Sequence, residues 1–65
     1  MLYENIKKIA KKKGISIYRI ERDIGLSNGI IGKWSNSIPS AENILKVSKY
    51  LGVPVETLLS EKKGV

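Results

Sequence analysis

The segment SIYRIERDIGLSNGIIGKW, residues 16–34, constrains the fold of this chain more than any other stretch. Its apolar residues recur at helical spacing on both sides of a Gly-Leu-Ser interruption, which predicts two short helices that share one buried side. Gly25 is placed to end the first helix, because glycine readily adopts the left-handed conformation found at helix ends. Ser27 is placed to cap the second helix with its side-chain oxygen. Ile31 and Trp34 are three residues apart and are predicted to face the core.

The rest of the chain is predicted to be helical as well, because no strand-like alternation of apolar and polar residues occurs. Helical spacing, serine caps and glycine stops predict five helices over residues 2–13, 17–24, 28–35, 41–51 and from Pro54 to about residue 59. Pro39 keeps the loop 36–39 out of any helix, and residues 61–65 are predicted to be a frayed tail. We therefore expect a single all-α domain over residues 1–65.

Composition excludes several classes of protein. The chain has neither cysteine nor histidine, so we expect no disulfide, no metal site and no cofactor. It has no apolar run long enough for a transmembrane helix and no signal-peptide pattern, which predicts a soluble cytoplasmic protein. No enzyme constellation is present: Glu21 and Asp23 are two residues apart on one helix and do not face each other. The run Gly29–Lys33 lacks the spacing of a phosphate-binding loop.

The positive charge of the chain suggests a polyanionic partner. The net charge is +6 and the isoelectric point is about 9.8. Residues 1–33 hold eight Lys and Arg against three Asp and Glu, and residues 34–65 hold four against three. Lysines are also stabilising at the negative C-terminal end of a helix, where the first helix carries them. The alternative that the basic residues form only a solvated face therefore stays open.

Four segments, GLSNGIIGKW, NSIPS, AENILKVSKYLG and VPVETLL, together resemble the Cro/repressor (Xre-like) family of helix-turn-helix DNA-binding regulators of phages and bacteria. The resemblance covers roughly residues 4–59. It implies a five-helix, lambda-repressor-like domain that docks helix 28–35 in the major groove of double-stranded DNA. Glu21 departs from the family, since many members carry a small alanine there. We expect its side chain to reach solvent or to pair with Lys33 or Arg22.

The resemblance and the outward positions of helix 28–35 together indicate the residues that read DNA. The expected base-reading residues are Asn28, Gly29 and Lys33, flanked by Ile30 and Gly32. Asparagine can bond adenine and lysine can bond guanine. The expected phosphate contacts are Ser16, the N–H of Ile17, Arg19, Ser27, Asn36 and Ser37.

Several of these residues also have plain structural interpretations. Asn28 could satisfy only local backbone groups, and Lys33 could contact a phosphate rather than a base. Ile30 could touch a thymine methyl or cover the edge of the fourth helix. Trp34 could stack on a base, although its spacing favours the core.

The two glycines of helix 28–35, Gly29 and Gly32, are a second departure from the family. Each costs roughly 0.5–1 kcal/mol relative to alanine inside a helix. They either let the backbone approach the bases closely or make the helix weak. If Gly29 lies inside a helix, Gly29→Ala should stabilise the fold.

The resulting hypothesis is a sequence-specific transcriptional repressor that binds a two-fold operator as a homodimer. We expect the dimer to be weak without DNA and to use the last helix, through Val55, Leu58 and Leu59. The main alternative is a protein-interaction module of the same fold, antitoxin-like or anti-repressor. A basic membrane-surface peptide is a remote second alternative. Binding to duplex DNA that weakens with salt separates the first hypothesis from the others.

Overall fold

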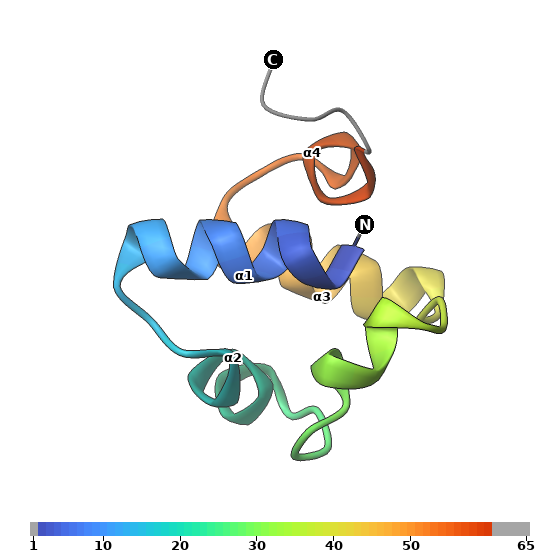
Figure 1. Ribbon diagram of the computed structural model, residues 1–65, viewed down its shortest axis with the longest axis horizontal. Coiled ribbons are helices and arrows are strands. Elements are labelled where there is room, and N and C mark those ends of the chain that lie inside the picture. The colour runs from blue at the N-terminus through green and yellow to red at the C-terminus, as the bar shows by residue number, and fades with distance from the viewer. Residues whose placement is uncertain (1, 61–65) are drawn as a thin grey trace.

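The computed structural model describes residues 2–60, and in this range it consists of helices without a strand. The elements are α1 (Leu2–Lys13), α2 (Ile17–Ile24), the 3-10 helix η1 (Ile31–Ser35), α3 (Ala41–Leu51) and α4 (Val55–Leu59). Helix α1 crosses the middle of the molecule, with α4 on one side of it and α2 and η1 on the other (Figure 1). The all-α class is confirmed. Five α-helices are not, since the described residues form four and one 3-10 helix. The predicted frayed tail, 61–65, lies outside the described residues.

Serine and glycine set the helix ends where the sequence predicts them. The Ser16 hydroxyl oxygen accepts a hydrogen bond from the Arg19 N–H at 3.0 Å. Gly25 ends α2 with a left-handed φ of 79°, which glycine adopts without a steric penalty. Ser40 caps α3 by accepting from the Asn43 N–H at 3.3 Å. The predicted bounds 2–13, 17–24 and 41–51 are confirmed.

All five helices contribute to one apolar core. Its buried residues are Ile6, Ala10, Ile20, Ile31, Trp34, Ile44, Val47, Leu51 and Leu58. Ile31 is fully buried and Trp34 is 5% exposed, which confirms that both face the core. Helix η1 packs against α1, and Ile31 and Trp34 are its buried side chains.

A side-chain amide joins the last helix to the first. Asn5 of α1 donates from Nδ2 to the carbonyl oxygens of Leu58 and Ser60, both at 2.7 Å. These carbonyls lie at the end of α4, where no further helical turn can bond them. Leu58 is fully buried, whereas Leu59 is 46% exposed. The predicted use of Leu58 in a dimer contact is therefore wrong, and the apolar surface of α4 comes from Leu59 and the partly buried Val55.

A polar contact fixes α2 against α3. The Tyr50 hydroxyl of α3 donates a short hydrogen bond to Asp23 Oδ2 of α2. The same carboxylate lies 3.3 Å from Arg19 Nε and 3.9 Å from Arg22 Nε. The Tyr50 hydroxyl and these guanidinium groups hold the pKa of Asp23 below its ordinary value of 3.8. The hydrogen bond to Asp23 raises the pKa of Tyr50 above 10.0.

This contact predicts a loss of stability at both ends of the pH range. A carboxyl with a lowered pKa stabilises the fold above its unfolded pKa, and this is lost as pH falls through the folded value. A phenol with a raised pKa stabilises the fold below its unfolded pKa, and this is lost as pH rises through the folded value. We expect the melting temperature, measured by circular dichroism, to be constant between about pH 4 and about pH 10. In Tyr50→Phe both declines should be shallower; identical pH profiles for the two proteins would contradict this origin.

Candidate nucleic-acid interface

The second half of the 16–34 segment begins with a turn, not with a helix. The Ile30 N–H donates to the Ser27 carbonyl at 3.1 Å, and the Lys33 N–H donates to the Ile30 carbonyl at 3.0 Å. The regular structure that follows is the 3-10 helix Ile31–Ser35. The predicted helix over 28–35 is therefore wrong in its first three residues and in its helix type.

The backbone of Gly29 gives the physical reason. Its φ is +86°, which lies outside the right-handed helical region and is costly for any residue with a Cβ atom. A helix cannot pass through a residue in this conformation. Gly29 is thus present for the turn that it makes, and the helix-interior penalty assumed from the sequence does not apply to it.

The expected effect of Gly29→Ala consequently changes sign. A Cβ atom at Gly29 would meet no atom within 4 Å, so the cost is backbone strain alone, about 1–2 kcal/mol. We expect Gly29→Ala to lower the free energy of unfolding by this amount in urea titration. Gly32→Ala is the matched control, since its Cβ also meets nothing and its φ is not positive. Equal stability of the two variants would show that the left-handed turn carries no strain for alanine.

Glu21 is the residue whose side chain holds this turn in place by hydrogen bonds. It is 2% exposed, and its two carboxylate oxygens accept hydrogen bonds from different backbone N–H groups. Oε1 accepts from the Gly29 N–H and Oε2 from the Ile31 N–H, both at 2.9 Å. The expectation that Glu21 reaches solvent or pairs with Lys33 or Arg22 is therefore wrong.

The same geometry corrects the expected cap. Ser27 contributes its carbonyl to the turn, and no side chain at the N-cap position of η1 makes a capping bond. Glu21 supplies that function from α2. Its sequence signal was its place three residues before the inward-facing Ile24, a spacing that puts two residues on the same face of a helix.

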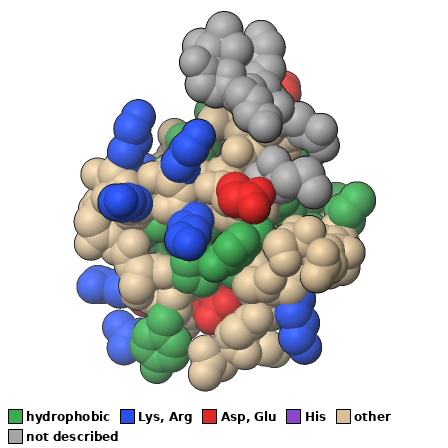
Figure 2. All heavy atoms as spheres, in the orientation of Figure 1, with side chains coloured by type: hydrophobic (Ala, Val, Ile, Leu, Met, Phe, Trp, Pro, Cys, Tyr) green, Lys and Arg blue, Asp and Glu red, His purple; other side chains and the backbone are tan. Residues whose placement is uncertain are grey.

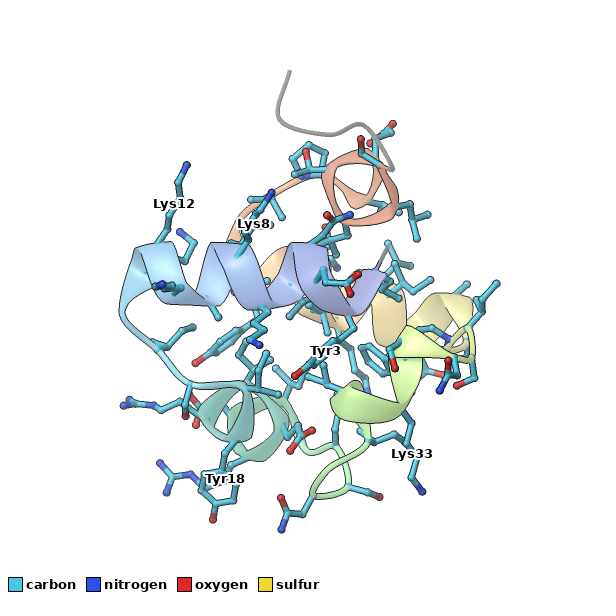
Figure 3. The ribbon with its side chains drawn as sticks, viewed as in Figure 1. Tyr3, Lys8, Lys12, Tyr18 and Lys33 are labelled. Atoms are coloured by element: carbon cyan, nitrogen blue, oxygen red, sulfur yellow. The ribbon has the colours of Figure 1, made fainter. Side chains whose placement is uncertain are left out.

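The predicted base-reading residues are all exposed to solvent. Asn28, Gly29, Gly32 and Lys33 are exposed, and Ile30 is half-buried against the core. Lys33 points from η1 towards the same edge of the molecule as Tyr18 of α2 (Figure 3). Tyr18 is 57% exposed and was not predicted as a site residue.

The residues predicted to contact phosphates precede and follow this segment in the sequence. Several of them already make hydrogen bonds or ion pairs within the protein. Ser16 caps α2, and the Ile17 N–H lies in the first turn of α2, where no helical carbonyl precedes it. Arg19 pairs with Asp23. Ser37 donates from its hydroxyl to the Lys33 carbonyl at 3.0 Å.

The positive charge is spread over two sides of the molecule. Lys and Arg side chains are dense over α1 and sparser over α2 and η1 (Figure 2). Lys8 and Lys12 point away from the edge to which Tyr18 and Lys33 point (Figure 3). The basic N-terminal half therefore does not concentrate its charge at the candidate interface, where the cations of α2 and η1 are Arg19, Arg22 and Lys33.

A short α-helix, the connecting residues 25–30 and a 3-10 helix that exposes polar residues together have the layout of a helix-turn-helix protein. A helix-turn-helix family model matches residues 6–58. The chain belongs to the Cro/C1-type (Xre-like) helix-turn-helix family. No curated protein and no solved structure matches the chain significantly.

Membership of this family indicates a DNA-binding regulator, and such domains are typically not enzymes. None of the helices in residues 2–60 has the length and apolar character needed to cross a membrane.

Proposed function

We propose that the protein binds double-stranded DNA sequence-specifically and represses transcription. The observation that supports this most is the exposure of Asn28 and Lys33 on a segment anchored from beneath by Ile31 and Trp34. Reading base edges requires polar side chains on a backbone segment that is held in place by the core, because discrimination between bases depends on donors and acceptors in fixed positions.

In this proposal the segment 28–35 enters the major groove as a turn followed by η1. Asn28 bonds an adenine and Lys33 a guanine. Gly29 and Gly32 allow close approach, and Ile30 offers apolar contact at the flank. The phosphate contacts fix the orientation on the duplex without reading sequence; they are Ser16, the N–H of Ile17, Arg19, Ser27, Asn36 and Ser37. Such a regulator works in the cytoplasm of a bacterial host.

Selection of duplexes from a random pool tests the proposal directly. We expect enrichment of one motif, and binding to it that weakens with salt. The logarithm of the binding constant should fall with the logarithm of salt concentration with a slope of about −2 to −3 per protomer, given three cations on α2 and η1 and a slope of roughly −0.9 per phosphate neutralised. Failure to enrich any motif, with salt-insensitive capture of a protein instead, would favour the interaction-module alternative.

A homodimer on a two-fold operator is the arrangement that we propose for binding. It places two copies of η1 about 34 Å apart, one turn of DNA. With Leu58 buried and Leu59 only half exposed, α4 offers little of the roughly 800 Å² per partner that stable interfaces bury. We expect sedimentation to show a monomer at micromolar concentration without DNA and two copies on the selected duplex. A stable dimer at nanomolar concentration would contradict this.

A further inference from the structure

A buried negative charge lies directly behind the candidate DNA-reading segment. Glu21 is 2% exposed, and acidic side chains are almost never buried this deeply unless they are paired. Its partners here are two backbone N–H groups, eight and ten residues further along the chain. Among the described residues, no buried polar side-chain atom lacks a hydrogen-bond partner. The charge is thus accommodated by the turn itself.

The two N–H groups lie at the two ends of the short stretch that connects the candidate base-reading side chains. Gly29 directly follows Asn28, and Ile31 begins the 3-10 helix that carries Lys33. One carboxylate therefore ties both ends to α2. Hydrogen bonds to an ionised acceptor are about twice as strong as neutral ones, so this contact restricts the position of the Asn28 backbone relative to η1.

The same charge acts against DNA as an electrostatic group. A carboxylate close to the DNA surface repels phosphates, and it occupies N–H groups that could otherwise bind an anion at the start of a helix. Two backbone N–H groups donate to Glu21, and each donor needs only an acceptor oxygen, which a neutral side chain can also supply. A buried carboxylate at Glu21 is advantageous if a fixed geometry of the turn contributes more to recognition than overall attraction to DNA does.

We propose that Glu21 is a positioning residue for sequence recognition. It sets the geometry between Asn28 and Lys33 and lowers affinity for DNA of arbitrary sequence, so that it raises the ratio of specific to non-specific binding. This inference rests on the proposed function. It assigns to Glu21 an effect on discrimination that a purely structural capping residue does not have.

Glu21→Gln separates the two roles. Glutamine keeps the size of the side chain and one carbonyl oxygen, but its NH₂ group cannot accept the second N–H bond. Two probes are used with the full chain: the duplex that wild type enriches from a random pool, and a scrambled duplex of equal composition. We expect tighter binding to the scrambled duplex. The ratio of specific to non-specific affinity should fall roughly 5- to 150-fold, the range that loss of recognition of one base pair spans.

Glu56→Gln is the matched control for charge, because Glu56 is exposed on α4, on the other side of α1 from η1 (Figure 1). It should leave the ratio unchanged. Gly29→Ala perturbs the same turn while keeping the charge, and should lower the ratio without tighter binding to the scrambled duplex. All measurements are made at a temperature where circular dichroism shows the variants to be folded.

The outcomes separate this inference from the proposed function. If wild type enriches a motif but folded Glu21→Gln and Gly29→Ala keep its ratio, Glu21 is only a structural cap and the inference is overturned while the proposed function stands. If wild type enriches no motif, both are overturned. If Glu21→Gln does not fold, Glu21→Ala takes its place, since it removes the charge and both acceptors without adding an atom to the DNA-facing side: a lowered ratio supports positioning by Glu21, and an unchanged ratio overturns it.

Discussion

Replacing Trp34 with alanine should remove a large share of the free energy of unfolding. A chain of this length is stabilised by about 3–10 kcal/mol in total, and truncation of a buried Trp to Ala costs about 3–5 kcal/mol. Trp34 is 5% exposed and, with Ile31, holds η1 in the core, so its loss also frees the segment that carries Lys33. Urea titration followed by circular dichroism measures the change.

Ile38→Ala provides the comparison for that experiment. Ile38 is 85% exposed in the loop after η1, so its truncation should change the free energy of unfolding by less than about 0.5 kcal/mol. A Trp34→Ala protein as stable as Ile38→Ala would show that η1 is not held by its aromatic anchor.

The second large effect concerns DNA. On the selected duplex, Asn28→Ala and Lys33→Ala should each weaken binding by about 1–3 kcal/mol and relax specificity at one base position. Both side chains are exposed, so the folded state should survive each change. Competition binding against duplexes mutated one position at a time measures the loss and locates it.

Lys12→Ala is the control for charge, because Lys12 points away from the edge that bears Lys33 (Figure 3). It should leave specificity intact. If Lys33→Ala weakens binding to every duplex equally and reduces the salt slope by about one, Lys33 contacts a phosphate and not a base. If Asn28→Ala binds all duplexes as wild type does, Asn28 serves only its local backbone.

The predictions from sequence succeeded where the signals are local. Ser16 and Gly25 determine the ends of α2 by interactions within a few residues, and such signals can be identified in the chain without knowledge of the fold. The core positions of Ile31 and Trp34 likewise follow from their spacing of three, which is similar in an α-helix and a 3-10 helix.

The prediction failed where a distant partner decides the local conformation. The segment after Ser27 has helical apolar spacing, but its first turn is held by Glu21, eight residues before Gly29. From the sequence, the two glycines were compatible with close approach to the bases or with a weak helix, and Glu21 with a side chain that reaches solvent or pairs with a cation. The fold brings Gly29 and Glu21 together: the carboxylate needs donors, and the left-handed glycine presents one. The assignment of individual DNA contacts stays a prediction.

The Asn5 contact with the end of α4 bears on how the chain assembles. Helix α4 has five residues, too few to persist by itself in water, and its hydrogen bonds to Asn5 span 53 and 55 residues of sequence. Contacts this distant form only after most of the intervening chain is ordered, because loop closure must come first. We therefore expect the first and last helices to join late during folding and to separate early during unfolding. In hydrogen exchange, amides of α4 should open at a lower free energy than those of α1 and α3.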